Sequence, residues 1–244
     1  MKTYRLTSNA TAVRHVRVGR RVKEEQLHKM IEEILVGTKD AANAASLRVE
    51  PAQDRSLARI DALLDAAAAV VDEVGFDRLS TAQVAETSGA SIGTVYRYFP
   101  DRIALLTALR DRAILRYRLT ASDELERRSP ETWQEAFVCL ADVYEQMFRV
   151  EPGFRILRFE EVHGAGEADD TPDHLHEFAE RVAQVLATRY AFDWDDELVF
   201  RLEVATQLAS SLIERAHVYG PAWRSRLLAE APGVAVAYLE KFYD

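Results

Sequence analysis

Hydrophobic residues recur at spacings of three and four along most of the chain, which is the pattern of helices with one buried face. No stretch alternates between apolar and polar residues over the length of a strand. We therefore expect an all-α fold in which Pro232-Gly233 interrupts the last helix. The spacing predicts helices over residues 24–36, 56–74, 101–119, 130–150, 154–163, 173–190, 195–219 and 222–242.

Two short helices joined by a tight turn are expected within residues 79–99. Ser80 and Gln83 have the spacing of a capping box at the start of the first helix. Gly89 lies where the chain reverses, and glycine tolerates the left-handed backbone that such a turn requires. Ser91 is a good N-cap for the second helix. Helix, glycine turn and helix together form a helix-turn-helix pattern.

The second of these helices presents a surface suited to nucleic acid. Val95 and Phe99 are expected to face inward, since they are four residues apart. The residues left on the outside carry hydroxyls, aromatic rings and a guanidinium, with no carboxylate among them. They are Thr94, Tyr96, Arg97 and Tyr98.

Residues 59–106 resemble the DNA-binding domain of the tetracycline-repressor (TetR) family of bacterial regulators. The resemblance covers three helices and the start of a fourth. It is carried by Ile60, Leu64-Asp-Ala-Ala67, Gly75-Phe76, Ser80-Thr81, Val84-Ala85, Gly89, Ser91, Gly93-Thr94-Val95-Tyr96, Tyr98-Phe99, Arg102 and Leu105.

The DNA contacts follow from this pattern and from side-chain chemistry. We expect Arg97 to read a base, because arginine pairs bidentately with guanine. Ile92 either touches a thymine methyl group or covers the domain core, and Gly93 lets the backbone approach the DNA closely. The remaining contacts are expected at phosphates, from Arg59, Thr81, Ser91, Thr94, Tyr96, Tyr98 and Arg102.

The chain is expected to comprise three parts. Residues 1–52 form a basic N-terminal extension, and residues 53–100 form the TetR-like DNA-binding domain, with its helix-turn-helix motif at 79–98. Residues 101–244 form a helical domain for effector binding and dimerisation, as the resemblance implies. The amphipathic helix at 24–36 can pack on its own subunit, on a dimer partner or on neither.

The resemblance also implies two sites in the C-terminal part. Aromatic and large apolar residues form either the core of the helical bundle or the lining of an effector pocket, namely Trp133, Phe137, Tyr144, Met147, Phe148 and Phe159. Dimer contacts are expected on the helix at 195–219, from Ala205, Leu208, Ala209 and Leu212.

The net charge of −9 is distributed unevenly. Residues 1–50 carry ten basic and six acidic side chains, residues 51–118 carry nine of each, and residues 119–244 carry 12 and 25. Because affinity for DNA depends on local charge, an acidic C-terminal part does not exclude DNA binding. Residues 1–23 hold seven Lys or Arg and no acid, which fits a DNA-binding arm, a solvated tail, an organelle transit peptide or residues before the true translation start.

Other kinds of site find little support in the sequence. His174 and His176 are two residues apart and fall on different helix faces, so the acidic loop around residues 163–176 predicts no metal site, and we expect no cofactor. Cys139 lies in an apolar stripe and cannot form an internal disulfide, which favours a reducing cytoplasm. No run is long enough to span a membrane, and no enzyme motif is present.

We therefore expect a cytoplasmic, sequence-specific transcriptional regulator. It is expected to be a homodimeric repressor that binds double-stranded DNA at a palindromic operator and is released by an unknown small-molecule effector. One alternative is an interaction protein whose degenerate helix-turn-helix does not read DNA. The other is an all-α enzyme that uses a cavity in the C-terminal part.

Overall fold

The computed structural model describes residues 24–36, 51–158 and 174–243, and within these ranges all regular structure is helical. The expectations for residues 1–23, the linker at 37–50, Phe159 and the acidic loop up to 173 lie outside the described residues. The helices are α1 (Glu24–Val36), α3 (Pro51–Val74), α4 (Thr81–Ser88), α5 (Ile92–Tyr98), α6 (Arg102–Arg128), α7 (Trp133–Val150), α9 (His174–Tyr190), α10 (Asp196–Ala216) and α11 (Pro221–Leu239), with short 3₁₀ turns η1 (Phe76–Arg78) and η2 (Phe154–Arg158).

Several helix boundaries differ from the prediction. The helix predicted from residue 56 begins at Pro51, because proline fits the first turn of a helix, where no N–H partner is lost. The helix predicted to end at 119 continues to Arg128. The helix predicted from Pro130 begins at Trp133, since Thr132 and Glu135 form a capping box there.

The expected interruption of the last helix at Pro232-Gly233 is wrong. Helix α11 passes through Pro232, although proline cannot donate the backbone hydrogen bond of a helix interior. Ala231, Ala235 and Leu239 are buried on either side of this position. Packing of this face against the rest of the protein therefore outweighs the one lost hydrogen bond.

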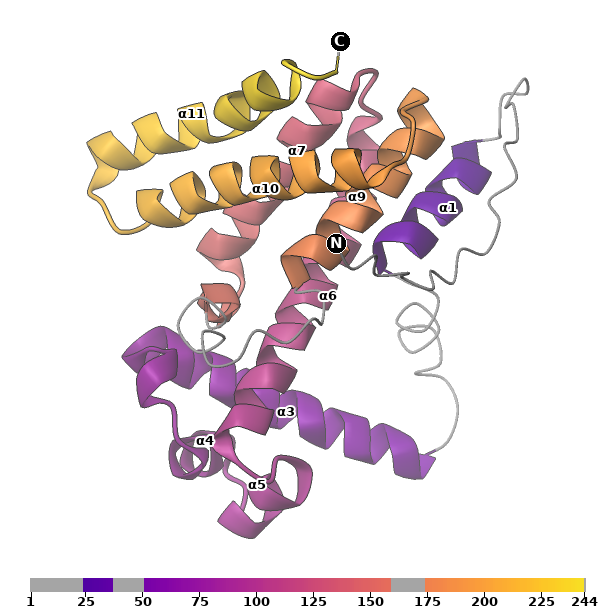
Figure 1. Cartoon of the computed structure of the whole chain (residues 1–244). Helices are drawn as coiled ribbons and strands as arrows, with labels where there is room; N and C mark the ends of the chain where they lie inside the picture. Colours follow the sequence, from indigo (N-terminus) through magenta and orange to yellow (C-terminus); the bar gives the residue numbers. More distant parts are fainter. Residues whose placement is uncertain (1–23, 37–50, 159–173, 244) are drawn as a thin grey trace, which may run out of the picture.

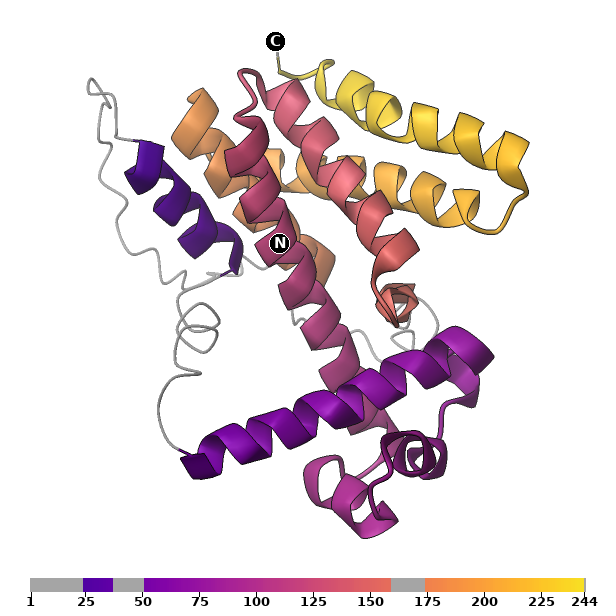
Figure 2. The ribbon, with the colours of Figure 1, turned by 180° about the vertical axis from the view of Figure 1, so that it is seen from behind.

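Two parts of the molecule are joined by one long helix (Figure 1). Helices α3, α4 and α5 form the part that we call the reading head, and α7, α9, α10 and α11 form the part that we call the body. Helix α6 runs from one to the other, and α3 lies across its first turns in both opposite views (Figure 2).

Helix α6 contributes to the hydrophobic core at both ends. Leu105, Leu106 and Leu109 are buried near its start, where it closes the core of the reading head. Ala121 and Leu125 are buried near its end, within the body. A helix of 27 residues is about 40 Å long, so any tilt of α6 in the body displaces the reading head.

A second contact joins body and reading head at the turn after α7. Gly153 has a φ of 74°, and a Cβ atom placed on it would lie 2.8 Å from Cα and Cβ of Ala68 in α3. Its N–H donates to Oδ2 of Asp72, also in α3, over 3.1 Å. We call this contact of Gly153 with Ala68 and Asp72 the seam.

Helix α1 packs on its own chain, against α6 and α9. This is the first of the three possibilities that the sequence left open. Ile31, Ile34 and Leu35 are buried in this contact. Nη1 of Arg181 in α9 donates to the carbonyl oxygen of Ile34 over 2.8 Å. This bond satisfies one of the carbonyl groups that a helix end leaves without an intrahelical partner.

Candidate nucleic-acid interface

The helix-turn-helix forms as its capping residues predict. Oγ of Ser80 accepts from the N–H of Gln83 over 3.3 Å, and Oε1 of Gln83 accepts from the N–H of Ser80 over 2.9 Å. Gly89 has a φ of 66° and ends α4 in the left-handed conformation. Oγ of Ser91 then accepts from the N–H of Thr94 over 3.1 Å and so caps α5. These local bonds fix how α5 leaves the turn.

The inner face of α5 anchors it to the reading head. Val95 and Phe99 are buried, as predicted, and belong to the same core as Val84 and Leu63. The opposite face is open to solvent, and helix α5 contains no acidic residue. Its outer surface is therefore free of the charge that would repel phosphate.

Ile92 and Tyr96 stand on this outer face. Ile92 is 43% exposed and Tyr96 is 51% exposed, which favours an outward-facing role for Ile92 over one in covering the core. Gly93 and Ser91 are exposed beside them. The first turn of α5 thus offers a branched apolar side chain, a small backbone surface and a hydroxyl to a ligand.

Thr81 supports this face from beneath. Its side chain is only 9% exposed, and its hydroxyl donates to the hydroxyl oxygen of Tyr96 over 3.3 Å. The structure therefore gives Thr81 the role of positioning Tyr96. The predicted direct contact of its side chain with phosphate does not fit this burial.

A second polar group lies at the other end of α5. The hydroxyl oxygen of Tyr98 accepts from Nη2 of Arg97 over 3.1 Å and from Oγ of Ser56 in α3 over 3.4 Å. The guanidinium of Arg97 also lies over the Tyr98 ring, 4.8 Å from its centroid. The bond from Ser56, with the bond and charge of Arg97 and the charge of Arg59, lowers the pKa of Tyr98.

This arrangement places two cations where α5 ends and α3 begins. Arg97 and Arg59 are both exposed, and Tyr98 is half-buried between the two helices. Sequence reasoning missed Ser56, because only the fold brings α3 to the end of α5. Arg97 in turn lies in the last turn of α5, away from the first turn that carries Ile92.

Arg102 forms two hydrogen bonds within the reading head. Its Nε donates to the carbonyl oxygen of Leu79 over 2.9 Å, and its Nη2 donates to that of Phe76 over 2.7 Å. These two bonds give Arg102 a structural role, and its phosphate contact stays a prediction. Its guanidinium holds the η1 turn, which leads into α4, against the start of α6.

Two family models and solved structures of known proteins match this chain. The model described as "Bacterial regulatory proteins, tetR family" matches residues 63–109. The model described as "Tetracyclin repressor-like, C-terminal domain" matches residues 131–243. A crystal structure of a TetR-family transcriptional regulator from Streptomyces coelicolor is 30% identical and has a TM-score of 0.64, over 78% of this chain and 99% of that one.

The chain belongs to the TetR family. It is therefore a DNA-binding transcriptional regulator with the helix-turn-helix and helical C-terminal domain of that family. The crystal structure of RolR without ligand is 18% identical over 72% of this chain and 96% of its own, with a TM-score of 0.44. No curated protein sequence matches the chain significantly. Helix α1 and the first turns of α3 lie outside both ranges that match TetR-family models.

The aromatic residues proposed to line a TetR-type effector pocket fall into separate groups. Trp133 packs against Phe192, with ring centroids 6.0 Å apart. Tyr144 and Phe148 instead pack around Phe154, at 5.5 and 6.3 Å. Trp133 and Phe148 are about 22 Å apart along α7, so they do not line one small site together.

The other described residues of that set are also packed or hydrogen-bonded within the chain. Phe137 and Met147 are buried, and the hydroxyl of Tyr144 donates to Oε1 of Glu214 over 2.8 Å. Phe148 alone of the described members lines a hollow that opens at the seam. The lining role of the six residues as a set stays a prediction, because no ligand contact tests it.

The residues predicted to form the dimer contact divide between two sides of α10. Ala205 and Ala209 are buried within their own chain, so their assignment to an intermolecular contact is wrong. Leu208 is 37% exposed, and Leu212 is half-buried against the cluster formed by Ala141, Ile213 and Ala231. Spacing at three and four marked an apolar face but did not tell which partner covers it.

Among residues 24–36, 51–158 and 174–243, no three His, Cys, Asp or Glu side chains lie together as ligands of a metal ion. In the same part of the chain, every helix is too short or too polar to cross a membrane.

The contacts of Arg102 predict a local loss of stability when they are removed. Replacing Arg102 with alanine deletes two charge-assisted hydrogen bonds, which should lower the free energy of unfolding of the reading head by about 2 kcal/mol. Amide hydrogen exchange of α4 in the full chain measures this effect. Arg59→Ala is the control, because Arg59 is exposed, and it should leave α4 as protected as in the wild type. Equal protection in both variants would contradict the structural role of Arg102.

Proposed function

We propose that this TetR-family regulator is a repressor that binds a palindromic operator as a homodimer and is released by a small-molecule effector. The observation that supports DNA reading best is the outer face of α5, which is exposed, free of acidic residues and rigidly capped. In helix-turn-helix proteins the second helix lies in the major groove, with its N-terminal residues at the base edges.

We propose that base reading centres on the first turn of α5. Ile92 is placed to contact a thymine methyl group, and Gly93 permits a close approach of the backbone. Tyr96, held by Thr81, follows one turn later on the same face. Ser91 and Thr94 offer hydroxyls at the entry of the helix to phosphates.

Arg97 changes role in this proposal. Its bond to Tyr98 and its place in the last turn of α5 favour a phosphate rather than a guanine, with Arg59 and Tyr98 beside it. Phosphate contacts fix the position of a protein on the duplex but carry no sequence information. We therefore propose that the first turn of α5 reads bases and that its last turn anchors the protein to phosphates.

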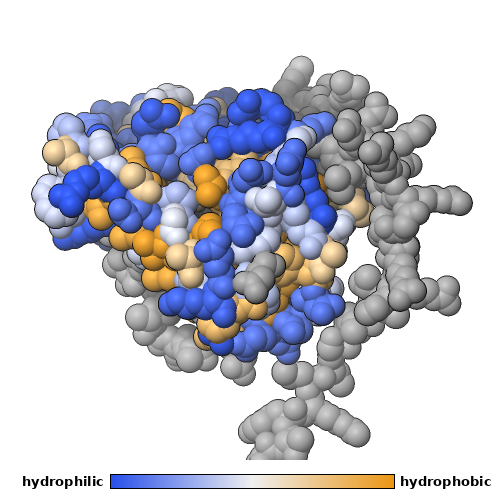
Figure 3. Space-filling model, turned by 90° about the horizontal axis from the view of Figure 1, so that it is seen from above, coloured by the Kyte–Doolittle hydropathy of each residue, from blue (hydrophilic) through white to orange (hydrophobic). Residues whose placement is uncertain are grey.

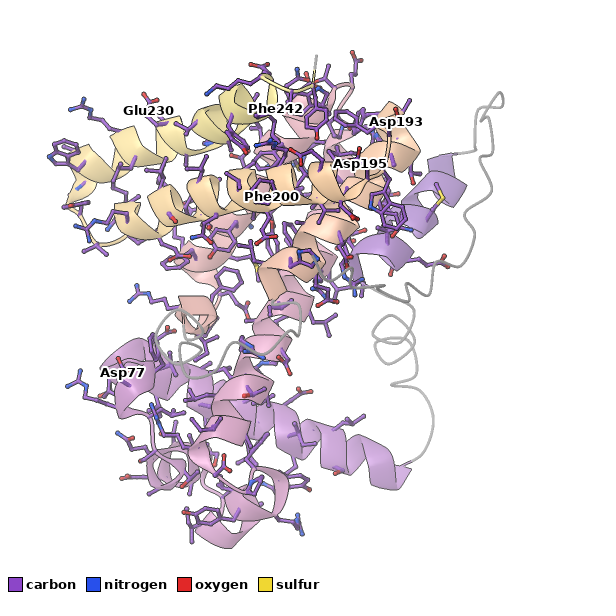
Figure 4. All side chains as sticks on the ribbon, in the orientation of Figure 1. Asp77, Asp193, Asp195, Phe200, Glu230 and Phe242 are labelled. Carbon is purple, nitrogen blue, oxygen red and sulfur yellow. The ribbon has the colours of Figure 1, made fainter. Side chains whose placement is uncertain are left out.

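The homodimer is proposed to form through the outer faces of α10 and α11. These helices are antiparallel and form the upper side of the body, where hydrophobic surface lies among polar side chains (Figure 3). Large exposed apolar residues occur on both helices. Phe200 lies on α10 (Figure 4), as does Leu208, and Val234 lies on α11. Two-fold symmetry would present two reading heads to the two halves of a palindrome.

Release by an effector is proposed to work through the two connections between body and reading head. An effector that binds better to a body in which α6 or the seam has shifted would stabilise that state. The affinity for DNA would then fall by the difference in effector affinity between the two states, and by no more.

Selection of genomic DNA fragments by the purified full-length protein tests DNA reading. The wild type should recover a palindromic site at low salt without ligand. A variant carrying Tyr96→Ala and Arg97→Ala should recover no site, because it lacks one side chain from the proposed reading face and one proposed phosphate contact. Recovery of nothing above this variant would contradict DNA reading and favour a protein partner for the reading head.

The single substitution Arg97→Ala separates the two roles of that residue. A phosphate contact predicts a similar loss of affinity on every sequence and a smaller dependence of log affinity on log salt, by about 0.9 for one contact. A base contact predicts relaxed preference at one position of the site.

The dimer proposal predicts that a charge on the outer face of α10 separates the subunits. Leu208→Glu combined with Val234→Glu should shift the full-length protein towards a monomer, because two carboxylates would be buried without partners. Sedimentation equilibrium measures the change. Leu57→Glu is the control, since Leu57 is comparably exposed but lies on α3. A dimer that persists in the double variant would place the interface elsewhere.

A further inference from the structure

A hollow of about 260 Å³ opens at the seam between reading head and body. Helix α3, the end of α7 and the η2 turn each contribute to it. Its lining consists of Asp72, Phe148, Arg149, Val150, Glu151, Pro152 and Arg155. Its volume is just below the range of about 300–1,000 Å³ that is typical of ligand pockets, so it suits only a small molecule.

The two acidic residues of the lining already have partners. Glu151 forms an ion pair with Arg116 of α6. Oδ2 of Asp72 accepts the hydrogen bond from the N–H of Gly153. Asp72 keeps its negative charge, but among the described residues neither carboxylate forms an ion pair with Arg149 or Arg155.

Among the described residues, little negative charge lies close enough to neutralise the two arginines of the lining. Nε of Arg149 lies 3.9 Å from Oε1 of Glu145, at the limit of an ion pair, and most of its side chain is exposed. Arg155 is exposed, and among the described residues no carboxylate forms an ion pair with it. Planar guanidinium groups bind carboxylates and phosphates through two parallel hydrogen bonds.

His217 packs on Phe148 of the hollow and is affected by the positive charge of Arg149 and Arg155. The ring of His217 packs on Phe148, with centroids 4.8 Å apart, and its side chain is only 10% exposed. Its Nε2 has no hydrogen-bond partner among the described residues. Burial lowers the pKa of His217, and the charges of Arg224, Arg155 and Arg149 lower it further, against the opposite effect of Glu145.

We propose that this hollow binds a small oxyanion, a carboxylate or a phosphate, between Arg149 and Arg155. The part of this inference that concerns DNA rests on the proposed function, whereas binding of the oxyanion does not. The site lies at the contact that holds the reading head to the body. It is separate from the aromatic residues that were expected to line a pocket, apart from Phe148.

Occupation of the site acts on the seam through Asp72. An oxyanion in the hollow brings a negative charge close to the Asp72 carboxylate, and like charges at short distance repel each other. The bond from Gly153 to Asp72 is then weakened, and α3 loses one of its connections to the body. The bound oxyanion therefore favours a state with a freer reading head and a lower affinity for the operator.

Thermal unfolding and calorimetry of the full-length protein test binding. The probes are inorganic phosphate, succinate and benzoate, each compared with sodium chloride at the same ionic strength. At least one probe should raise the unfolding midpoint of the wild type, because a ligand that binds only the folded state stabilises it. Comparison of the three distinguishes phosphate from aliphatic and aromatic carboxylate.

Matched variants assign the binding to these residues. Arg149→Gln combined with Arg155→Gln should weaken binding by at least about tenfold, because charge-assisted hydrogen bonds are lost. Arg226→Gln removes an exposed arginine from α11 and should bind like the wild type. No response of the wild type to any probe, or an equal response of the double variant, would overturn the proposal.

Asp72→Asn tests the regulatory step separately. Asparagine keeps an oxygen that accepts from Gly153 but removes the charge. The variant should therefore bind the oxyanion at least as tightly and release a selected operator less than the wild type does. Release equal to that of the wild type would overturn the role of Asp72. Failure of the ligand-free wild type to bind any operator would instead count against the proposed function.

Discussion

Helix α6 is the constraint on which the rest of the structure depends, because this single rigid element packs into the reading head at one end and into the body at the other. Its first turns bury Leu105, Leu106 and Leu109 in the core beside α3, and its last turns bury Ala121 and Leu125 within the body. Arg102 ties the start of the same helix to the backbone before α4. The orientation of α5 therefore depends on α6, whose other end lies among the body helices.

The seam is a second connection between the reading head and the body. A rigid helix alone would allow the reading head to turn about its end, but Gly153 touches the backbone of α3 at a second point. The residue at this point must be glycine, because a Cβ atom would overlap with Ala68 and the φ of 74° disfavours other residues. A change in the body thus reaches the reading head by two routes, of which the seam depends on one hydrogen bond and one close contact.

The sequence predicted local structure well and long-range partners poorly. The capping box of Ser80 and Gln83 and the left-handed Gly89 were readable, because each depends on residues within one turn. The acceptors of Arg102 are backbone carbonyls 23 and 26 residues away, which no side-chain pattern marks. Ala205 and Leu208 both carry apolar side chains, so spacing did not separate the face packed within the chain from the exposed one.

The account rests most directly on the claim that α5 lies in the major groove of an operator. A cysteine at Thr87 carrying an iron chelate tests it, since Thr87 is exposed at the end of α4, just before the turn into α5, and has no proposed contact with DNA, while the native Cys139 is buried. The account predicts hydroxyl-radical cleavage of both strands around the major groove of each half-site of a selected operator. Cleavage centred on the minor groove, or no cleavage of a bound operator, would contradict it.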